Sequence, residues 1–502
     1  MSGIKMFRDP VHDMIAFHRG GDSETNDPSE WGDALLLELI DTEEMQRLRR
    51  IRQLGPASLV YPCAEHSRFS HALGVAHLTK RILRALLKQQ PDLINRRSIP
   101  LIKAAALLHD VGHGPYSHVF EQILPSSNNH ETWSWRIITG NTQVANVLER
   151  YAARTGILRE ELHRQLGGVL GHREPDADLR LGRQIISSQL DADRMDYLLR
   201  DAHFSGVAYG RFDLEWLLRS LRARKVNRSW TLCVDIGKGP TALESYLSAR
   251  DHMYRQVYDH KTVRAFEALL THIFGALIWF FETEHRLPND TPSAILGYLL
   301  PVLNRSETPE LRHFLELDDA LLDYAIQNWS VIFSHATPAR RELARKCRMF
   351  RHRQPVYRRV RWLPDNAQPG THSPGPDLLS DTETVMRLQL FLAKHSSSMI
   401  EVSEPPTLHP IQAPLGLLTH LDRVIRTPYT KPDGDKSNIG SIHVLNAAGV
   451  TQLAENASPL VRFLGQQERH SVRLFVDPHA EKSVIGYLRK HLKLPSITPQ
   501  EP

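Results

Sequence analysis

The chain has 502 residues, of which 41% are hydrophobic and 24% are charged, and its formal net charge is +5 at pH 7. This composition is typical of a globular protein long enough for two or more domains. Three well-separated cysteines, Cys63, Cys233 and Cys347, argue against a disulfide framework and favour a reducing compartment.

The sequence predicts neither a membrane span nor an export signal. It contains no run of about 18 apolar residues, as a spanning helix requires. The nearest candidate, residues 268–281, is too short and is expected to be a core helix. The N-terminus lacks the apolar stretch of a signal peptide, so we expect a cytoplasmic protein without a membrane partner.

The N-terminal residues predict a strand and turn followed by helices. Residues 4–17 alternate apolar and polar side chains around Asp9-Pro10, which favours a strand and turn. Apolar residues recur at helical spacing over 34–54, with a cap midway at Asp41-Thr42, so two helices are expected. Residues 66–90 predict one strongly periodic helix whose apolar face includes His71, so this imidazole should point toward the core.

Residues 101–121 form the segment around which the rest of the chain is organised. An apolar helical run over 101–108 ends at His109-Asp110, and the glycines and proline of 112–115 stop the helix. His113 and His118 follow in the same segment. A buried helix thus delivers an imidazole and a carboxylate into a turn, and this ligand pair suits a divalent metal. A single His-Asp pair would more often be a hydrogen-bonded surface pair.

Residues 191–201 concentrate charge, with four carboxylates and two arginines in eleven residues. Asp193, Asp196 and Tyr197 are spaced to share one face of a helix. Apolar neighbours such as Met195 and Leu198 favour partial burial, where carboxylates are costly unless a cation accompanies them. A solvated helix face is the alternative.

The remaining elements predict a mainly α fold. Helices are expected at 130–138, 157–170, 181–190, 242–265, 268–281, 292–303 and 317–332, and a strand at 226–236. A helical core is therefore expected over 1–335.

The C-terminal part has a different pattern. The basic run 340–361 is interpreted as a solvated helix face followed by a linker, in preference to a phosphate-binding surface. We therefore expect a basic helix and Pro-rich linker over 336–395, with the prolines in 362–381. A small α+β region should follow over 396–502, with strands at 400–402, 441–445 and 472–476 and helices at 449–454, 459–466 and 480–492.

One set of residues in these elements has the chemistry of a metal site. His71, His109, Asp110 and Asp193 supply two imidazoles and two carboxylates, a ligand set compatible with Mn, Fe, Zn or Mg. This H…HD…D pattern resembles that of the HD-domain metal phosphohydrolases, and the resemblance implies that all four residues are metal ligands.

The resemblance extends to one branch of that superfamily, the sterile-alpha-motif/HD deoxynucleoside triphosphate triphosphohydrolase and its bacterial homologues. It rests on stretches in order over about residues 5–270: FRDPVHD, QRLRRIRQLG, HSRFSHALGV, LLHDVGHGPYSHVFE, HE at 130–131, DADRMDYLLRDAHFSGV and YRQVYDHK. We expect no sterile-alpha-motif domain ahead of them. The resemblance implies a helical HD core, removal of the whole triphosphate from a deoxynucleoside triphosphate, and a homo-oligomer, either dimer or tetramer.

The resemblance also implies roles for single residues. Catalytic and phosphate-contacting roles fall on His113, His118 and His130, with Glu121 orienting one of them where relatives have aspartate. The residues that would bind the substrate are Arg68, Gln53, Leu54, Arg194, Tyr197, Asp201, Arg250, Tyr258 and Lys261. Among these, Arg194 stands where a lysine is usual. Cationic groups and a metal offset the charge that develops at phosphorus, and an imidazole can protonate the departing 5′ oxygen.

A weaker part of the resemblance concerns regulation. Lys5, Asp41, Gln46 and Arg49 match positions at which relatives bind an activating guanine nucleotide, GTP or dGTP, between subunits. His443 stands where relatives have an arginine. A surface salt-bridge network between Asp41 and Arg49 is the alternative.

Two other functions remain open on the sequence alone. The metal site also suits a phosphodiesterase or nuclease acting on nucleic acid, for which the basic run 340–361 is the motive. The second is a nucleotide-sensing or nucleic-acid-binding module in which catalysis is secondary; the intact ligand set argues against it.

Overall fold

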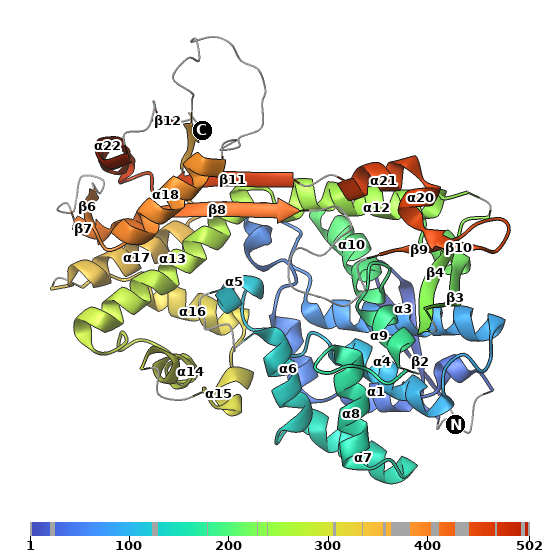
Figure 1. Ribbon diagram of the computed structural model, residues 1–502. Helices are drawn as coiled ribbons and strands as arrows, with labels where there is room; N and C mark the ends of the chain where they lie inside the picture. Colours follow the sequence, from blue (N-terminus) through green and yellow to red (C-terminus); the bar gives the residue numbers. More distant parts are fainter. Residues whose placement is uncertain are drawn as a thin grey trace. The chain divides into compact units, whose positions relative to one another are not determined.

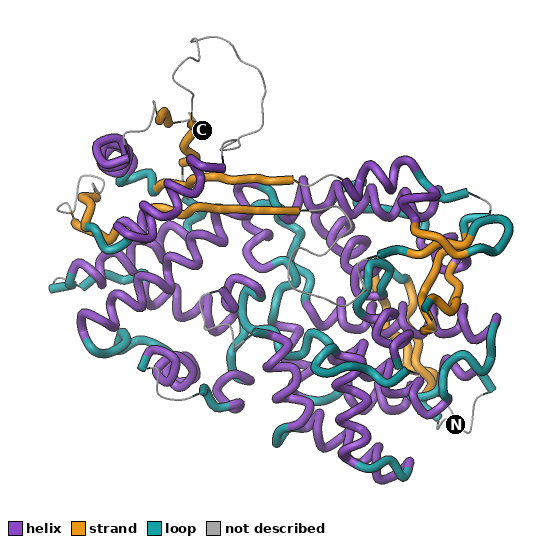
Figure 2. The backbone as a smooth tube through the Cα atoms, in the orientation of Figure 1, coloured by secondary structure: helices purple, strands orange, loops and turns teal. Residues whose placement is uncertain are grey.

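The computed structural model describes residues 3–20, 26–122, 129–177, 179–227, 229–237, 239–304, 308–333, 335–354, 358–362, 382–402, 411–426, 441–466, 469–492 and 497–499. The fold is mainly α, as predicted, and Figure 2 shows helices as the prevailing element in purple. The chain divides into two compact units: Met1–Val257 with Leu311–Asp319 and Thr427–Gln467, and Tyr258–Glu310 with Ala320–Arg426 and Glu468–Pro502. Neither unit is one continuous segment of the chain, because residues of the C-terminal region belong to both units.

The first unit is a helical assembly with two small sheets (Figure 1). Its helices are α1 (Asp33–Ile40), α2 (Glu43–Arg47), α3 (Arg68–Gln89), α4 (Ile99–Leu108), α5 (His118–Gln122), α6 (His130–Thr139), α7 (Gln143–Thr155), α8 (Arg159–Leu170), α9 (Arg180–Ile186), α10 (Ala192–Ser205), α11 (Leu214–Ser220), α12 (Thr241–Met253), α15 (Leu311–Leu315), α20 (Ala454–Ala457) and α21 (Pro459–Gln466). Short 3-10 helices lie at Pro28–Glu30, Leu48–Arg50, Gly55–Leu59 and Arg96–Ser98.

The strands of the first unit explain why the C-terminal segment belongs to it. The predicted N-terminal strand and turn is an antiparallel hairpin of β1 (Ile4–Asp9) and β2 (Asp13–His18). The second sheet has the order β10-β9-β4-β3, formed by Thr451–Leu453, His443–Leu445, Ser229–Asp235 and Leu221–Val226. Strand β9 pairs in parallel with β4, so a segment more than 200 residues later in the chain completes this sheet. The helix predicted at 449–454 is wrong, because β10 pairs there with β9.

The central helices of this unit are α3, α4 and α10. All ten residues of α4 are buried; nine of them are apolar, as expected for a core helix, and Lys103 forms a buried ion pair with Asp33. Asp191 caps α10 by accepting a hydrogen bond from the backbone N–H of Arg194 at 2.7 Å, which ends the preceding helix at Ile186 rather than at 190 as predicted. Gly74 allows α3 and α10 to approach, since a Cβ there would lie 1.8 Å from Oδ1 of Asp196.

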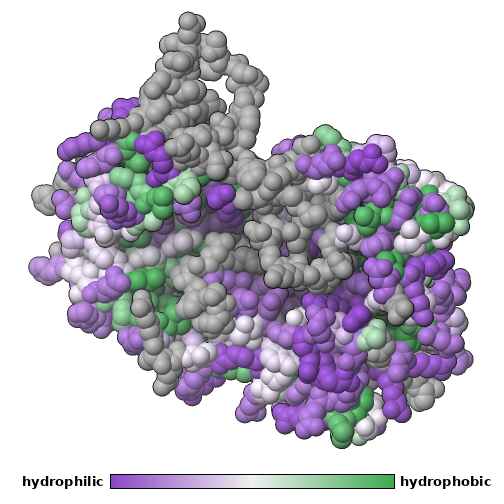
Figure 3. Space-filling view, in the orientation of Figure 1, coloured by the Kyte–Doolittle hydropathy of each residue, from purple (hydrophilic) through white to green (hydrophobic). Residues whose placement is uncertain are grey.

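Helices α6 to α8 show the usual division between a buried and a solvated face. Helix α7 was not predicted, although it buries Val144, Val147, Leu148 and Tyr151. On the face shown in Figure 3, hydrophilic side chains cover most of the surface over α6 to α8. These helices therefore enclose the apolar core on which the central helices pack.

The second unit combines long helices with strands. It contains α13 (Lys261–Glu284), α14 (Ser293–Leu303), α16 (Asp319–Trp329, whose first residue is assigned to the first unit), α17 (Pro338–Arg351), α18 (Thr382–His395), α19 (Leu415–Leu418) and α22 (Glu481–Leu492). Its sheets are β12-β5-β11-β8 and β6-β7, formed by Ile497–Pro499, Arg358–Trp362, Arg469–Val476, Thr419–Arg426, Met399–Val402 and Ile411–Pro414. Most of the linker predicted at 362–381 lies outside the described residues.

Two predictions for this part of the chain are corrected by the helices themselves. A single helix over 242–265 is wrong, because α12 ends at Met253, a π-helical turn spans Tyr254–Tyr258, and His260 caps the start of α13. Helix α13 is also longer than the predicted 268–281. At 24 residues, with a mean hydropathy of 1.4 in its most apolar 18, it is the one helix of the described chain that could cross a membrane by length and composition. Two thirds of that stretch (67%) is buried, as in a core helix.

The predicted solvated basic helix is wrong as well. Helix α17 buries most of its residues, among them Arg345, at 4% exposure, and Lys346, at 0%. Both cations contact Asp477, which directly follows β11. Their charges are therefore satisfied inside the second unit.

Candidate metal and catalytic site

Three helices of the first unit bring the four predicted metal ligands together. His71 lies on α3, His109 and Asp110 directly follow α4, and Asp193 lies in the first turn of α10. Nε2 of His71 lies 3.1 Å from Oδ1 of Asp193 and 3.8 Å from Oδ2 of Asp110. Nε2 of His109 lies 3.7 Å from Oδ1 of Asp193 and 3.4 Å from Oδ1 of Asp110. One ligand atom from each of His71, His109 and Asp193 lies within 4.8 Å of the other two, the spacing of a metal cluster.

The two imidazoles are held so that their Nε2 atoms face this cluster. Nδ1 of His71 lies 2.8 Å from Oδ2 of Asp196, and Nδ1 of His109 lies 2.9 Å from the carbonyl oxygen of Ala106. The Nε2 atoms are buried and make no hydrogen bond of regular geometry with a described residue. Metal-binding histidines are oriented in this way by an acceptor on the second ring nitrogen. The donor set therefore fits a divalent metal, whose identity the ligands leave open.

Asp196 is a supporting residue that the sequence interpretation did not assign to the site. Besides His71, its fully buried carboxylate contacts Nε2 of His12 at 2.7 Å and accepts two hydrogen bonds from Arg200 at 2.8 and 2.9 Å. Arg200 in turn donates to Asp9 at 2.7 Å. The signal was the three-residue spacing from Asp193, which places both carboxylates on one helical face; the partner His12 is 184 residues away in sequence.

A second cluster adjoins the first through Asp110. It contains Asp110, His113 and His130, whose ligand atoms also lie within 4.8 Å of one another. Nε2 of His113 lies 3.4 Å from Oδ1 of Asp110, and the rings of His113 and His130 stack at 4.0 Å. Glu121 lies 3.0 Å from Nδ1 of both histidines. Arg68 forms a close ion pair with Asp110 and donates to the hydroxyl of Ser117 at 2.8 Å.

Without a bound metal ion, the surroundings of the site raise the pKa of some histidines and lower that of others. Burial disfavours a charged His71, yet its interactions with Asp193 and Asp196 raise the pKa of this ring to about 10. Burial, together with the charges of Arg68 and His130, lowers the pKa of His113 to about 3. For His130 burial acts in the same direction, but Glu121 outweighs it and raises the pKa. The stacked pair thus consists of a neutral ring and a ring that favours a proton.

The remaining predicted substrate residues are placed as follows. Arg250 is buried and donates to Oε1 of Gln189 at 2.6 Å. Burial, together with the neighbouring Tyr254, raises the pKa of Tyr197, whereas the charges of Arg194 and Arg250 act to lower it. The side chains of Tyr197, Arg194 and Arg250 are therefore neighbours. Arg194 is engaged by Asp191 and by the carbonyl of Ser188.

Other predicted residues have no described contact with the ligands or belong to the second unit. Asp201 is buried and contacts Nε2 of His66 at 2.8 Å. Gln53 and Leu54 are half-buried between two 3-10 turns. Tyr258 and Lys261 belong to the second unit, at the end of the π-helical turn and the start of α13. His118 is the first residue of α5, and its side chain lies outside the described part of the structure.

The four residues predicted for an activator lie on the first unit. Lys5 is exposed on β1, with its ammonium 5.7 Å from the ring centre of Phe7. Asp41 ends α1, and Gln46 donates to the carbonyl of Ile40 at 2.7 Å. The described residues include no ion pair between Asp41 and Arg49. The guanidinium of Arg49 instead donates to Gln46 at 2.7 Å and lies 3.7 Å above the ring of Phe69.

Fold and site together define a helical protein in which a His-Asp ligand set suited to a divalent metal adjoins a second cluster of histidines. The family described as HD domain matches residues 68–201, which include all four ligands. The uncharacterized protein YwfO of Bacillus subtilis is 35% identical over 335 residues, spanning 66% of this chain and 67% of its own. The chain belongs to the HD-domain family of phosphohydrolases.

Further relatives include deoxynucleoside triphosphate triphosphohydrolase SAMHD1 of Gallus gallus, which is 30% identical over 308 residues. That match spans 56% of this chain and 47% of the relative, so about half of the relative's length has a counterpart here. A phosphohydrolase structure from Bacteroides thetaiotaomicron is similar in fold, with a TM-score of 0.66, 23% identity, and coverage of 95% of this chain and 100% of that one. A hypothetical protein from Aquifex aeolicus has a TM-score of 0.63 and 26% identity, with coverage of 96% and 99%.

Proposed function

We propose that the protein hydrolyses deoxynucleoside triphosphates to deoxynucleoside and inorganic triphosphate. The observation that carries this proposal is the adjacency of the two clusters through Asp110: a ligand set for a divalent metal on one side, and stacked histidines with different proton affinities on the other. The similarity to the triphosphohydrolase from chicken favours this reaction among those of the HD-domain family.

His71, His109, Asp110 and Asp193 would hold the metal, which when bound supplies charge to polarise a phosphoryl oxygen. The roles of the other residues follow from their charges. His130, whose pKa Glu121 raises, carries the proton that the 5′ oxygen needs as its bond to the α-phosphorus breaks. Arg68 and Arg250 are permanent cations that offset the charge of the triphosphate.

Purified protein incubated with each deoxynucleotide and Mn²⁺ or Mg²⁺ tests the proposal. Chromatography should resolve deoxynucleoside and intact inorganic triphosphate; deoxynucleoside monophosphate with pyrophosphate would contradict it. His130→Ala should lose turnover and keep its metal, measured by elemental analysis. His203→Ala, an exposed histidine on α10, is the matched control and should retain both.

The motive for the phosphodiesterase or nuclease alternative was the basic run 340–361, and it is weaker for two cations of that run, Arg345 and Lys346, which are buried and paired with acidic residues. Release of nucleotides from single-stranded DNA under the same conditions would restore it. We further propose that the enzyme is cytoplasmic, forms a homo-oligomer and is activated by a guanine nucleotide.

A further inference from the structure

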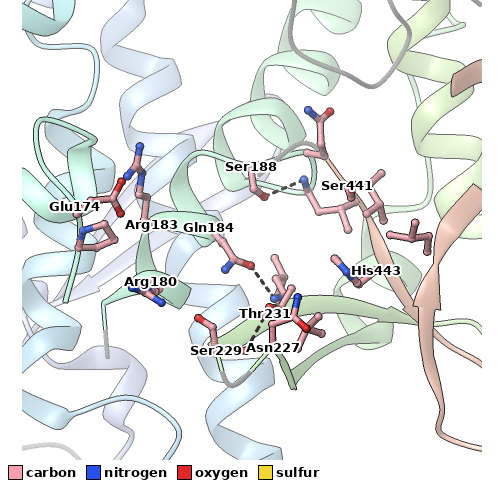
Figure 4. A pocket seen from close by; sticks show the side chains of 17 residues that line it. Glu174, Arg180, Arg183, Gln184, Ser188, Asn227, Ser229, Thr231, Ser441 and His443 are labelled. Atoms are coloured by element: carbon pink, nitrogen blue, oxygen red, sulfur yellow. Dashed lines mark hydrogen bonds between the residues drawn. The ribbon is translucent and has the colours of Figure 1, made fainter. Parts of the chain in front are cut away.

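A cavity of about 500 Å³ lies within the first unit and includes none of the residues of the two His-Asp clusters. It is lined by residues of α9 and of the segments before and after α9, by the facing ends of β3 and β4, and by residues 441–443. Figure 4 shows the side chains that line it, with Gln184, Ser229 and Thr231 between the two arginines and His443. The volume is that of a typical small-molecule site.

Two arginines give one wall of this cavity a positive charge. Arg180 and Arg183 lie three residues apart on α9, and both line the cavity. Glu174 also lines it, but neither arginine forms an ion pair with a carboxylate among the described residues. Arg183 is half-buried, so its charge is partly removed from water. An arginine in such a place without an acidic partner is suited to bind an anion from solution, above all a phosphate.

Polar groups on the other walls of the cavity could bind the part of a ligand that is attached to a phosphate. His443 faces the arginines across the cavity (Figure 4), and its Nδ1 atom is buried without a hydrogen-bond partner among the described residues. Ser229 and Thr231 of β4 add hydroxyl groups, whereas Leu190 and Ile442 are apolar. Hydrogen-bonding groups and apolar surface beyond the arginines leave room for a ring system attached to the phosphate.

One polar residue of the cavity has a structural task. Gln184 donates to the carbonyl of Trp230 at 3.2 Å and accepts from the N–H of Leu232 at 2.9 Å. Both partners belong to β4, so Gln184 joins α9 to that strand. The wall that bears the arginines is therefore held in place before a ligand arrives, which reduces the entropy cost of binding.

We propose that this cavity is a second ligand site, which binds a phosphorylated small molecule of nucleotide size through Arg180 and Arg183. The site stands apart from the proposed hydrolysis of deoxynucleotides and does not depend on it. The ligand class follows from two guanidinium groups that form no ion pair with a described carboxylate, a histidine whose Nδ1 atom has no hydrogen-bond partner among the described residues, and a volume of about 500 Å³.

Two residues that line the cavity also contact arginines that are predicted to bind the triphosphate of the substrate. The wall includes Ser188 and Gln189; the side chain of Gln189 accepts from Arg250 at 2.6 Å, and the carbonyl of Ser188 accepts from Arg194. A ligand in the cavity therefore contacts the segment that positions these two cations. This consequence alone rests on the proposed function, and it gives the second site a route for regulating the first.

Hydrogen–deuterium exchange of the metal-loaded full chain tests the site directly. The probes are inorganic phosphate, ribose 5-phosphate and AMP, each titrated separately. At ten times its dissociation constant, a ligand slows exchange through local opening by about tenfold. We expect this protection in peptides covering 179–191 and 226–234 in the wild type and in Arg219→Ala, which removes an exposed arginine of α11 outside the cavity. It should be absent from Arg180→Ala/Arg183→Ala.

The outcomes separate the sources of the phosphate. Protection by phosphate alone assigns the site to a free anion and contradicts a ligand of nucleotide size, whereas stronger protection by AMP assigns the rest of the cavity to a nucleoside and supports the proposal. No protection by any probe, or equal protection in the double variant, overturns it. Arg180→Ala alone, at an exposed position, keeps the test valid if the double variant does not fold. Protection of peptides from 101–121 reports the metal site separately, so failure here leaves the proposed hydrolysis untouched.

Discussion

Charged side chains are buried in both units, but their charges are balanced in one place and unbalanced in the other. In the second unit, Arg345 and Lys346 of α17 face Glu342 and Asp477, and all four are at most 5% exposed. Asp477 lies 2.7 Å from Arg345 and 2.5 Å from Lys346, and Glu342 lies 2.7 Å from Arg345. Two cations thus meet two anions, and this network needs nothing from outside.

Around His71 in the first unit the anions prevail. The described carboxylates there are Asp9, Asp110, Glu121, Asp193 and Asp196, whereas the guanidinium groups that contact them are those of Arg68 and Arg200. Part of the difference is met by protons, as the raised pKa of His71 indicates. Buried charges that balance indicate structure, and an excess of one sign beside oriented imidazoles indicates a site for an ion of the other sign.

The largest effect should come from the unbalanced region. His109→Ala or Asp193→Ala each removes a ligand that no neighbour replaces, so metal content and turnover should fall together by more than about 100-fold, beyond the effect of losing a residue that only orients a ligand. Elemental analysis and initial rates measure this. His203→Ala on the same helix as Asp193 should change neither quantity. Full metal content with full turnover in either ligand variant would show that the ligand set is misassigned.

The balanced region should respond in stability and not in metal content. Asp477→Asn keeps the shape of the side chain but leaves two buried cations facing one carboxylate, which should lower the free energy of unfolding by about 3–5 kcal/mol. Denaturant titration measures the loss, and added metal should not restore it. Asp13→Asn is the control, since the Asp13 side chain is 87% exposed in its pair with Arg8, and such pairs contribute at most about 1 kcal/mol. Equal losses in the two variants would remove the contrast.

The same contrast explains what the sequence could predict. The sequence could point to candidate metal ligands because His109-Asp110 is a local pair and His71 shares an apolar helical face, both of which periodicity reveals, and the structure brings these residues together. The sequence did not predict the burial of α17, because Asp477, the anion that compensates its buried cations, is 131 residues from Lys346 in the chain. For the same reason His12, which supports Asp196 from a distance of 184 residues, received no role. Sequence patterns report a residue's own helix, whereas charge compensation depends on tertiary contacts.

A smaller effect should follow pH in the second unit. Burial, with the charge of Lys346, lowers the pKa of His272 well below its usual value, so the folded protein keeps this ring neutral. Below about pH 6.5 the unfolded chain binds a proton there that the folded chain does not, and stability falls as pH falls, by up to about 1.4 kcal/mol per pH unit. His272→Phe should flatten the dependence between pH 6.5 and 5. His252→Phe, at an exposed histidine, should leave the slope unchanged; equal slopes in all three proteins would contradict the assignment.

The smallest effect on the folded chain, and the one that concerns assembly, is expected at Arg49. Its guanidinium is exposed yet already held by Gln46 and by the ring of Phe69, so it is oriented before any ligand binds. Removing it should cost no more than about 1 kcal/mol of stability, as for an exposed cation–π contact, and should leave metal content unchanged. If a guanine nucleotide binds here between subunits, it stabilises the oligomer by mass action. GTP or dGTP should then raise both the sedimentation coefficient and the initial rate of the wild type and of Arg8→Ala, an exposed arginine of β1, but neither quantity for Arg49→Ala. Identical rates and assembly with and without the nucleotide in the wild type would reduce Lys5, Asp41, Gln46 and Arg49 to surface residues and leave the cavity beside α9 as the candidate site for regulation.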